Sequence, residues 1–170
     1  MTHPELVELA RRFLFRKNPI VLTELTSIGE CADAIGFSLG VSTVIECKTS
    51  LSDYYAESSK PFRTNPHNGM GDYRYYLTPQ GLLKNVREGW GWLETDGKRI
   101  FKLRNASFFG SCNKRQELAV LASAMRRLGQ SSPKGISIKA YYISSSDRAT
   151  STIELEEQEA KQNEQTTGRV

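Results

Sequence analysis

The sequence predicts an α/β fold of the α+β type, in which helices flank a central mixed β-sheet. Segments of strand composition occur in a run, at 18–26, 31–37 and 41–49, rather than in strict alternation with helices. A second observation is the Asp96-Gly97 pair, which joins two apolar segments across 89–104 and is typical of a β-hairpin. The third is a pair of amphipathic segments, one at each end of the body of the chain.

The first of these segments, HPELVELARRFLF, predicts a helix, because Leu6, Leu9, Ala10 and Phe13 recur at helical spacing. The strand predicted at 18–26 follows an Asn-Pro pair. The next two predicted strands, 31–37 and 41–49, are joined near Leu39-Gly40. In the last of them, Val44, Glu46 and Lys48 point to one face of the sheet, whereas Ile45 and Cys47 point to the other.

The second half of the chain continues the same architecture. Ser50 stands three residues before Asp53, which predicts a helix start. The segment 60–72 holds two prolines and two glycines and is predicted to be a loop. A tyrosine-rich strand at 73–79, the added hairpin at 89–104 and a C-terminal helix at 114–128 follow. The sequence places Leu118, Leu121, Ala122 and Met125 on the apolar stripe of this helix, Gly129 at its end, and a further strand at 136–143.

Composition predicts one domain at 1–145 and a flexible acidic tail at 146–170. The tail has six acids against three bases, and the body carries 20 lysines and arginines against 13 acids. A body with a net charge of +7 is compatible with a polyanionic partner. Three separate cysteines and two histidines disfavour a zinc site. The absence of a long apolar run and of a signal-peptide pattern predicts a cytoplasmic chain with no membrane partner.

The hairpin of 31–37 with 41–49 predicts which charged residues meet. Residues equidistant from Leu39-Gly40 lie opposite each other, so Asp33 is expected to face Glu46, with Lys48 next along the strand. Two neighbouring carboxylates repel unless a cation lies between them, and oxygen ligands select Mg²⁺ or Mn²⁺. A lysine beside that ion would orient water or offset charge on a phosphoryl transition state. The alternative is an ordinary paired Glu-x-Lys couple on a solvated strand.

The Asp33, Glu46 and Lys48 pattern resembles the PD-(D/E)xK nuclease superfamily. More narrowly, ECADAIGF, VIECKTSLSDYYAESSKPFR, GMGDYRYYLTPQGLL and EGWGWLE resemble small phage and prophage nuclease-like proteins near the MmcB-like DNA-repair branch. The resemblance covers about 21–128. It implies a restriction-endonuclease-like core and metal-dependent cleavage of DNA. Asp33 and Glu46 would then bind Mg²⁺ or Mn²⁺, and Lys48 would be the catalytic lysine. Ala32 departs from the motif, which has proline before the aspartate.

A further acidic ligand is often supplied in that superfamily from an early helix or strand. Glu24 is the first choice here, because its strand is expected to neighbour the site, and its alternative is an edge-strand charge. Glu8 is more simply explained as a solvated residue of the first helix. Glu30 is more simply explained as a turn residue.

Five residues are candidates for nucleic-acid contacts, each with a structural alternative. Lys60 and Arg63 flank Pro61 and would hold phosphates or form a solvated basic loop. Ser50 would approach the scissile phosphate or cap a helix. Gly71 would allow close approach of a ligand or simply form a turn. Arg74 would meet the nucleic-acid backbone, or pack with Tyr76 in the core.

The leading hypothesis is a Mg²⁺-dependent endonuclease of phage or prophage type, in repair, recombination or host takeover. Its substrate would be duplex or single-stranded DNA, and a homodimer would supply the two active sites that duplex cutting needs. One alternative is a non-cleaving nucleic-acid-binding protein on the same fold. The other is a phage protein-interaction factor that uses its acidic tail.

Overall fold

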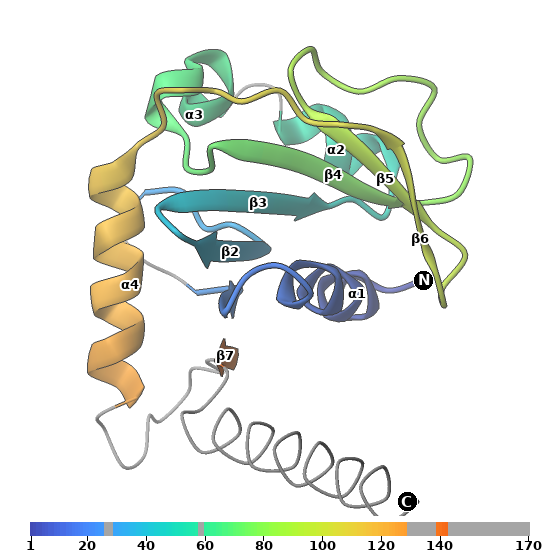
Figure 1. Ribbon diagram of the computed structural model, residues 1–170. Coiled ribbons are helices and arrows are strands. Elements are labelled where there is room, and N and C mark those ends of the chain that lie inside the picture. The colour runs from blue at the N-terminus through green and yellow to red at the C-terminus, as the bar shows by residue number, and fades with distance from the viewer. Residues whose placement is uncertain (26–28, 58–59, 129–138, 143–170) are drawn as a thin grey trace, which may run out of the picture.

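The computed structural model describes residues 1–25, 29–57, 60–128 and 139–142. The arrangement of helices and strands in this part of the chain is shown in Figure 1. In chain order they are α1 (His3–Phe15), β1 (Ile20–Thr23), β2 (Ala34–Ser38), β3 (Val41–Cys47), α2 (Leu51–Ala56), α3 (Pro61–Thr64), the 3-10 helix η2 (Pro66–Asn68), β4 (Tyr73–Pro79), β5 (Gly91–Thr95), β6 (Ile100–Arg104), α4 (Lys114–Leu128) and β7 (Lys139–Tyr142).

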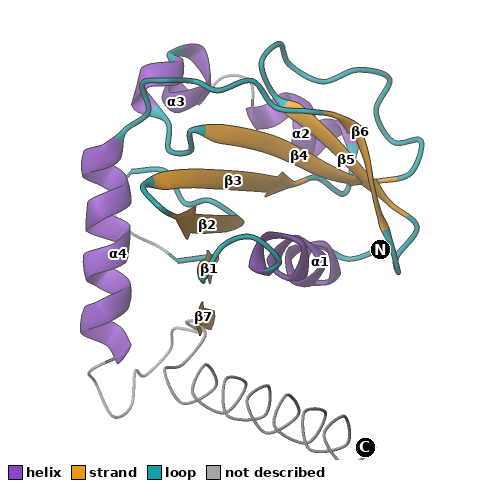
Figure 2. Ribbon diagram, in the orientation of Figure 1, coloured by secondary structure: helices purple, strands orange, loops and turns teal. Residues whose placement is uncertain are grey.

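The strands of the described residues form one seven-stranded mixed sheet in the order β6-β5-β4-β3-β2-β1-β7. β3, β4 and β5 run parallel to one another, and the remaining neighbours pair antiparallel. Helices lie on both faces of this sheet (Figure 2). The predicted mixed sheet flanked by helices is therefore confirmed, as are the hairpin β5–β6 and the helix α4.

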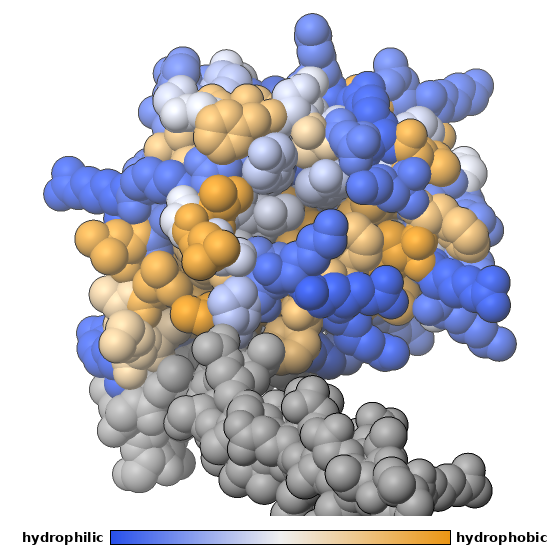
Figure 3. Space-filling model, in the orientation of Figure 1, coloured by the Kyte–Doolittle hydropathy of each residue, from blue (hydrophilic) through white to orange (hydrophobic). Residues whose placement is uncertain are grey.

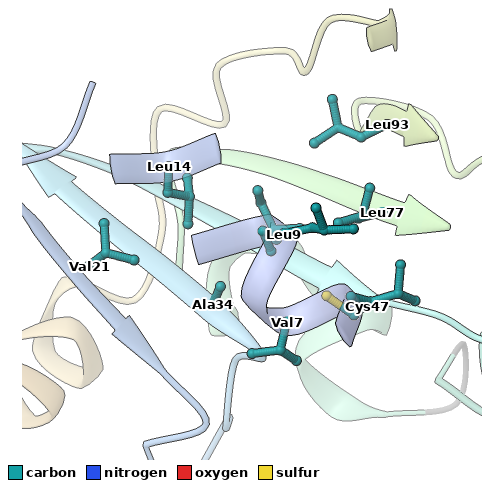
Figure 4. Close-up of a cluster of buried hydrophobic side chains, with 11 residues drawn as sticks. Val7, Leu9, Leu14, Val21, Ala34, Cys47, Leu77 and Leu93 are labelled. Carbon is teal, nitrogen blue, oxygen red and sulfur yellow. The ribbon is translucent and has the colours of Figure 1, made fainter. Parts of the chain in front are cut away.

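One face of the sheet is covered by α1 (Figure 4). Leu6, Leu9 and Ala10 from the predicted stripe are buried there, and they pack against Ile45 and Cys47 of β3. Each fully buried leucine contributes roughly 2 kcal/mol through removal of apolar surface from water. The inward residues of β3 on this side are those that strand alternation predicts.

The opposite face is covered by α4 and by the α2–α3 region. Val44 of β3 is buried here against Val120 and Ala124 of α4. The predicted stripe of α4 is wrong in register, since Leu118 and Met125 are 68% and 73% exposed. The reason is that the buried side chain of Glu117 faces the sheet. The Glu117 carboxylate accepts hydrogen bonds from Ser42 Oγ at 2.7 Å and from Gly71 N–H at 2.8 Å, and these bonds fix the rotation of the helix.

The structure also corrects several predicted boundaries. The predicted loop 60–72 contains α3 and η2, because Pro61 and Pro66 both take the first helical position, where a missing N–H costs nothing. The predicted strand 18–26 ends as β1 at Thr23, where Glu24 turns into the left-handed region at φ 50°. Of the predicted strand 136–143, the structure describes only 139–142, which form β7. Gly129 and the tail 146–170 lie outside the described residues.

Within the described residues, no helix is both long enough and apolar enough to cross a membrane.

Candidate active site

The β2–β3 hairpin has the predicted register. Ala34 pairs with Ile45, so Asp33 and Glu46 are the next two positions outward along the two strands. Asp33 lies just before the first residue of β2, and its Oδ2 accepts the backbone N–H of Cys47 at 2.7 Å. This hydrogen bond holds the Asp33 carboxylate at the carboxyl end of β3, beside the segment that carries Glu46 and Lys48.

Glu46 and Lys48 lie on the α2–α3 side of the sheet and are only 3% and 4% exposed. This corrects the solvated surface couple that was one alternative. Lys48 Nζ lies 2.6 Å from Glu57 Oε2, 3.4 Å from Glu46 Oε2 and 3.8 Å from Asp53 Oδ1. Lys48 is thus a buried cation surrounded by carboxylates.

Arg63 completes a buried ionic network and does not lie in a solvated loop. It is 3% exposed and forms ion pairs with Glu30, Glu57 and Glu46. In the pair with Glu46, Arg63 Nη2 lies 3.0 Å from Glu46 Oε1. Its guanidinium also lies over the ring of Trp90, 4.7 Å from the centroid. The prediction that Arg63 holds phosphates is therefore corrected, because its charge is already directed to the interior.

Two carboxylates of this network were assigned little or no role from the sequence. Glu30, interpreted there as a turn residue, is 1% exposed and also accepts the backbone N–H of Met70 at 2.6 Å. Glu57 received no role at all. The sequence feature that indicates a role for Glu57 is its position four residues after Asp53, because this spacing puts both carboxylates on one side of the α2 segment.

The electrostatics of the network follow from burial and crowding of like charges. Burial raises the pKa of Glu46 to about 8, and the nearby Asp33 and Glu57 carboxylates add to the rise against the opposing effect of Arg63 and Lys48. Burial alone would lower the pKa of Lys48, but Glu46 and Glu57 outweigh it and raise that pKa. Lys48 is consequently protonated at neutral pH and acts as a charge, not as a base.

The rim of the site is formed by His3, Glu24 and Asp33. His3 Nε2 lies 3.5 Å from Asp33 Oδ1 and 3.9 Å from Glu24 Oε1. Hydrogen bonding to Asp33 raises the pKa of His3, and Glu24 adds to the effect. Glu24 N–H also donates to the backbone oxygen of Asp33 at 3.1 Å. The structure therefore brings Glu24 next to Asp33, and it adds His3, which the sequence showed only as the start of a helix.

These residues fit a hard divalent cation in donor type and in charge. Asp33, Glu46 and Glu24 supply carboxylate oxygens, and carboxylates outnumber the cations Lys48 and Arg63 in and around the network. Glu46 Oε1 is buried and makes no well-oriented hydrogen bond, although it lies near Arg63. No group of three His, Cys, Asp or Glu side chains in the described residues already converges as a metal site.

The remaining predicted nucleic-acid contacts have structural roles or lie apart. Ser50 caps α2, since its Oγ accepts Asp53 N–H at 3.2 Å. Arg74 is buried and donates to the backbone oxygens of Pro66, Gly69 and Gly71, so it does not reach a ligand. Of the five, Lys60 alone is exposed.

Gly71 and Tyr76 are likewise committed to the protein interior. Gly71 has φ 89°, and a Cβ there would lie 2.9 Å from Val44, so close packing explains this glycine without a ligand. Tyr76 is buried and stacks on Trp90 with ring centroids 4.3 Å apart. Its ring is therefore unavailable for a nucleic-acid base.

Comparison with known proteins gives a likeness of fold. No protein-family model matches the chain, and no curated protein matches it either. Among solved structures, the chain is similar to a protein of unknown function from Silicibacter pomeroyi, with a TM-score of 0.59 and 20% sequence identity. The match covers 75% of this chain and 89% of that one. At this identity the similarity concerns the fold alone.

Proposed function

We propose that this chain is a divalent-metal-dependent nuclease with a restriction-endonuclease-like core, and that DNA is its substrate. The observation that carries the proposal is the juxtaposition of Asp33, Glu46 and Lys48 at the carboxyl end of β3. Two carboxylates and a protonated lysine are the groups that hydrolysis of a phosphodiester needs. The resemblance to PD-(D/E)xK nucleases assigns the same three residues.

In this proposal each residue has a defined task. Asp33 and Glu46 would hold Mg²⁺ or Mn²⁺, with Glu24 as the third carboxylate at the rim. The bound metal would activate water and offset negative charge on the phosphoryl group. Lys48, protonated at neutral pH and next to the proposed metal ligand Glu46, would offset negative charge that develops at the metal-bound phosphoryl group and orient the attacking water.

One observation favours a second candidate, a nucleic-acid-binding protein that does not cleave. Lys48 and Arg63 already compensate Glu46 and Glu57 through short contacts inside the protein. Such a network satisfies these buried charges without any ligand, so its presence does not require catalysis.

A plasmid-nicking assay separates the two candidates. Supercoiled plasmid is incubated with the full chain in Mg²⁺, in Mn²⁺ and in chelator, beside the Asp33→Asn and Lys48→Ala variants. The side-chain amide oxygen of the Asp33→Asn variant can still accept the Cys47 N–H, so this change removes charge with little change in geometry. We expect nicking to require metal and to fall about a hundredfold or more in both variants.

Asp96→Asn and Lys84→Ala are the matched controls, because both side chains are exposed and neither takes part in the ion pairs of the site. Thermal unfolding followed by circular dichroism verifies that each variant folds. Nicking that persists in both Asp33→Asn and Lys48→Ala would contradict the nuclease proposal. DNA binding without cleavage at any metal concentration would establish the second candidate.

A further inference from the structure

Two adjoining hollows lie at the end of α1 that is remote from the candidate active site. Their volumes are about 570 Å³ and 300 Å³, and they share Phe13 and Arg16 in their walls. The larger extends from α1 to the β2–β3 turn and to β4, and the smaller extends to the start of β6. Together they form one surface, called here the basic groove.

The charge of the basic groove is of one sign. Its charged wall residues are Arg12, Arg16, Lys17, Lys98, Arg99 and Lys102, and no Asp or Glu of the described residues lines either hollow. Arg12 is paired with Glu8 at 3.1 Å. None of the other five forms an ion pair with a carboxylate in the part of the chain that the structure describes. These cations are exposed to solvent, and although Asp96 of the hairpin turn lies near Arg99, the surface keeps the excess of positive charge that suits a polyanion.

Apolar and aromatic side chains lie between these charges. Phe13, Tyr73 and Tyr75 are partly exposed in the wall of the larger hollow, and Leu39 at its edge is fully exposed. Hydrophilic and apolar side chains are interleaved in the same way over the side of the molecule that carries α1 (Figure 3). A groove that combines cations with aromatic rings suits a single strand of nucleic acid, whose bases are free to stack.

The basic groove is distinct in position from the candidate active site. Val41 lines the groove and Glu46 lies five residues further along β3, which is ~17 Å at the rise of an extended strand. Thr43, the neighbouring wall residue of β3, belongs to the α1 side of the sheet, whereas Glu46 belongs to the α2–α3 side.

We propose that the basic groove binds single-stranded nucleic acid, with its lysines and arginines on the phosphates and its aromatic side chains against the bases. This surface is separate from Asp33, Glu46 and Lys48. The proposal does not depend on cleavage, so it can fail or succeed independently of the proposed nuclease function.

The test measures binding of the full chain to a fluorescent oligothymidine of about 16 nucleotides, in chelator, by anisotropy. The informative variant combines Arg16→Ala, Lys17→Ala and Lys102→Ala. Each phosphate contact to a single strand contributes a salt exponent of about 0.7, or about fivefold in affinity near 0.1 M salt. We therefore expect about a hundredfold weaker binding and a salt slope that is smaller by about 2.

A triple variant of equal charge, combining Lys84→Ala, Arg115→Ala and Arg126→Ala, is the matched control. These three side chains are exposed and lie outside the groove, so general charge effects appear in it as well. Equal affinities of the two triple variants would overturn the proposal. Tighter binding of the corresponding duplex would overturn it too, as would capture of polyglutamate in preference to the oligonucleotide.

Discussion

The residue that best shows what the fold does to single side chains is Arg63. A position that looks from the sequence like part of a solvated basic loop is instead enclosed by three carboxylates and by Trp90. A buried guanidinium is stable only when its donors are matched, and the planar fork of arginine can serve several carboxylates at once. Arg63 consequently holds β3, α2 and the segment before β2 in one arrangement.

Replacement of Arg63 by methionine tests this role. The change leaves Glu30, Glu46 and Glu57 buried with too little positive charge, so the free energy of unfolding should fall by roughly 3–5 kcal/mol. Urea unfolding of the purified protein measures it. Lys60→Met, at an exposed lysine three residues earlier, should change stability by less than about 0.5 kcal/mol. Similar losses in both variants would show that Arg63 is not central to the network.

The raised pKa of Glu46 predicts how stability depends on pH. The unfolded side chain ionises near pH 4.5 and the folded one near pH 8, so between these values the folded chain holds the extra proton. In chelator, the free energy of unfolding should therefore fall as the pH rises from about 5 to about 8, by roughly 1 kcal/mol per pH unit. Urea unfolding at several pH values measures the slope.

Glu46→Gln should remove most of that slope, because glutamine does not titrate. The pKa of His3 is raised as well, so the stability contributed by protonated His3 is also lost as the pH rises. The His3→Gln variant therefore measures how much of the slope comes from His3. A slope that persists unchanged in Glu46→Gln would contradict this prediction.

At the scale of elements, α2 connects the site to the sheet. It is a short helix of six residues, and none of them is buried. Isolated helices of this length are unstable in water, so its position depends on its ends. Ser50 caps the first turn, and Lys48 just before the helix pairs with Glu57 just after it. These two interactions define where Asp53 and Glu57 stand relative to β3.

Replacement of Ser50 distinguishes a helix cap from a phosphate contact. Ser50→Ala should lower the free energy of unfolding by about 1 kcal/mol, because Asp53 N–H loses its acceptor. Ser50→Asn, which retains a capping oxygen, should restore most of it. If Ser50 only caps the helix, nicking and oligonucleotide binding should be unchanged in both variants under conditions where they remain folded. Weakened DNA binding in a fully folded Ser50→Ala protein would favour the phosphate contact.

At the scale of the whole molecule, charge is distributed unevenly. The body 1–145 carries +7, and the segment 146–170 carries six acids against three bases. The basic groove and the candidate active site lie on opposite faces of the same sheet, so both experience the field of the complete chain. A chain without 146–170 should attract nucleic acid more strongly at low salt.

Truncation after residue 145 tests this expectation. Oligonucleotide affinity should rise several-fold at low ionic strength, and the gain should disappear at about 1 M salt, where screening is nearly complete. The control is the full-length chain with its six tail acids replaced by the corresponding amides, which changes charge but not length. Unchanged or weaker binding by both proteins would contradict the electrostatic explanation.

The sequence by itself determined the local and periodic features of this protein. The stripe of α1, the β5–β6 turn at Asp96-Gly97 and the hairpin register of β2 with β3 depend on neighbouring residues, and each was predictable. The register was enough to bring Asp33 next to Glu46 and Lys48, because pairing about a short turn fixes which residues face each other.

Tertiary structure decided which charges are buried and by what they are paired. Glu30, Glu57 and Arg63 meet only after α2 and α3 have packed on the sheet, and the rotation of α4 depends on Glu117 reaching Ser42 and Gly71. The basic groove likewise combines α1 with residues of β6 that are about 90 positions later in the sequence. Composition and spacing do not specify such contacts, because their energy depends on desolvation and on partners brought together by the complete fold.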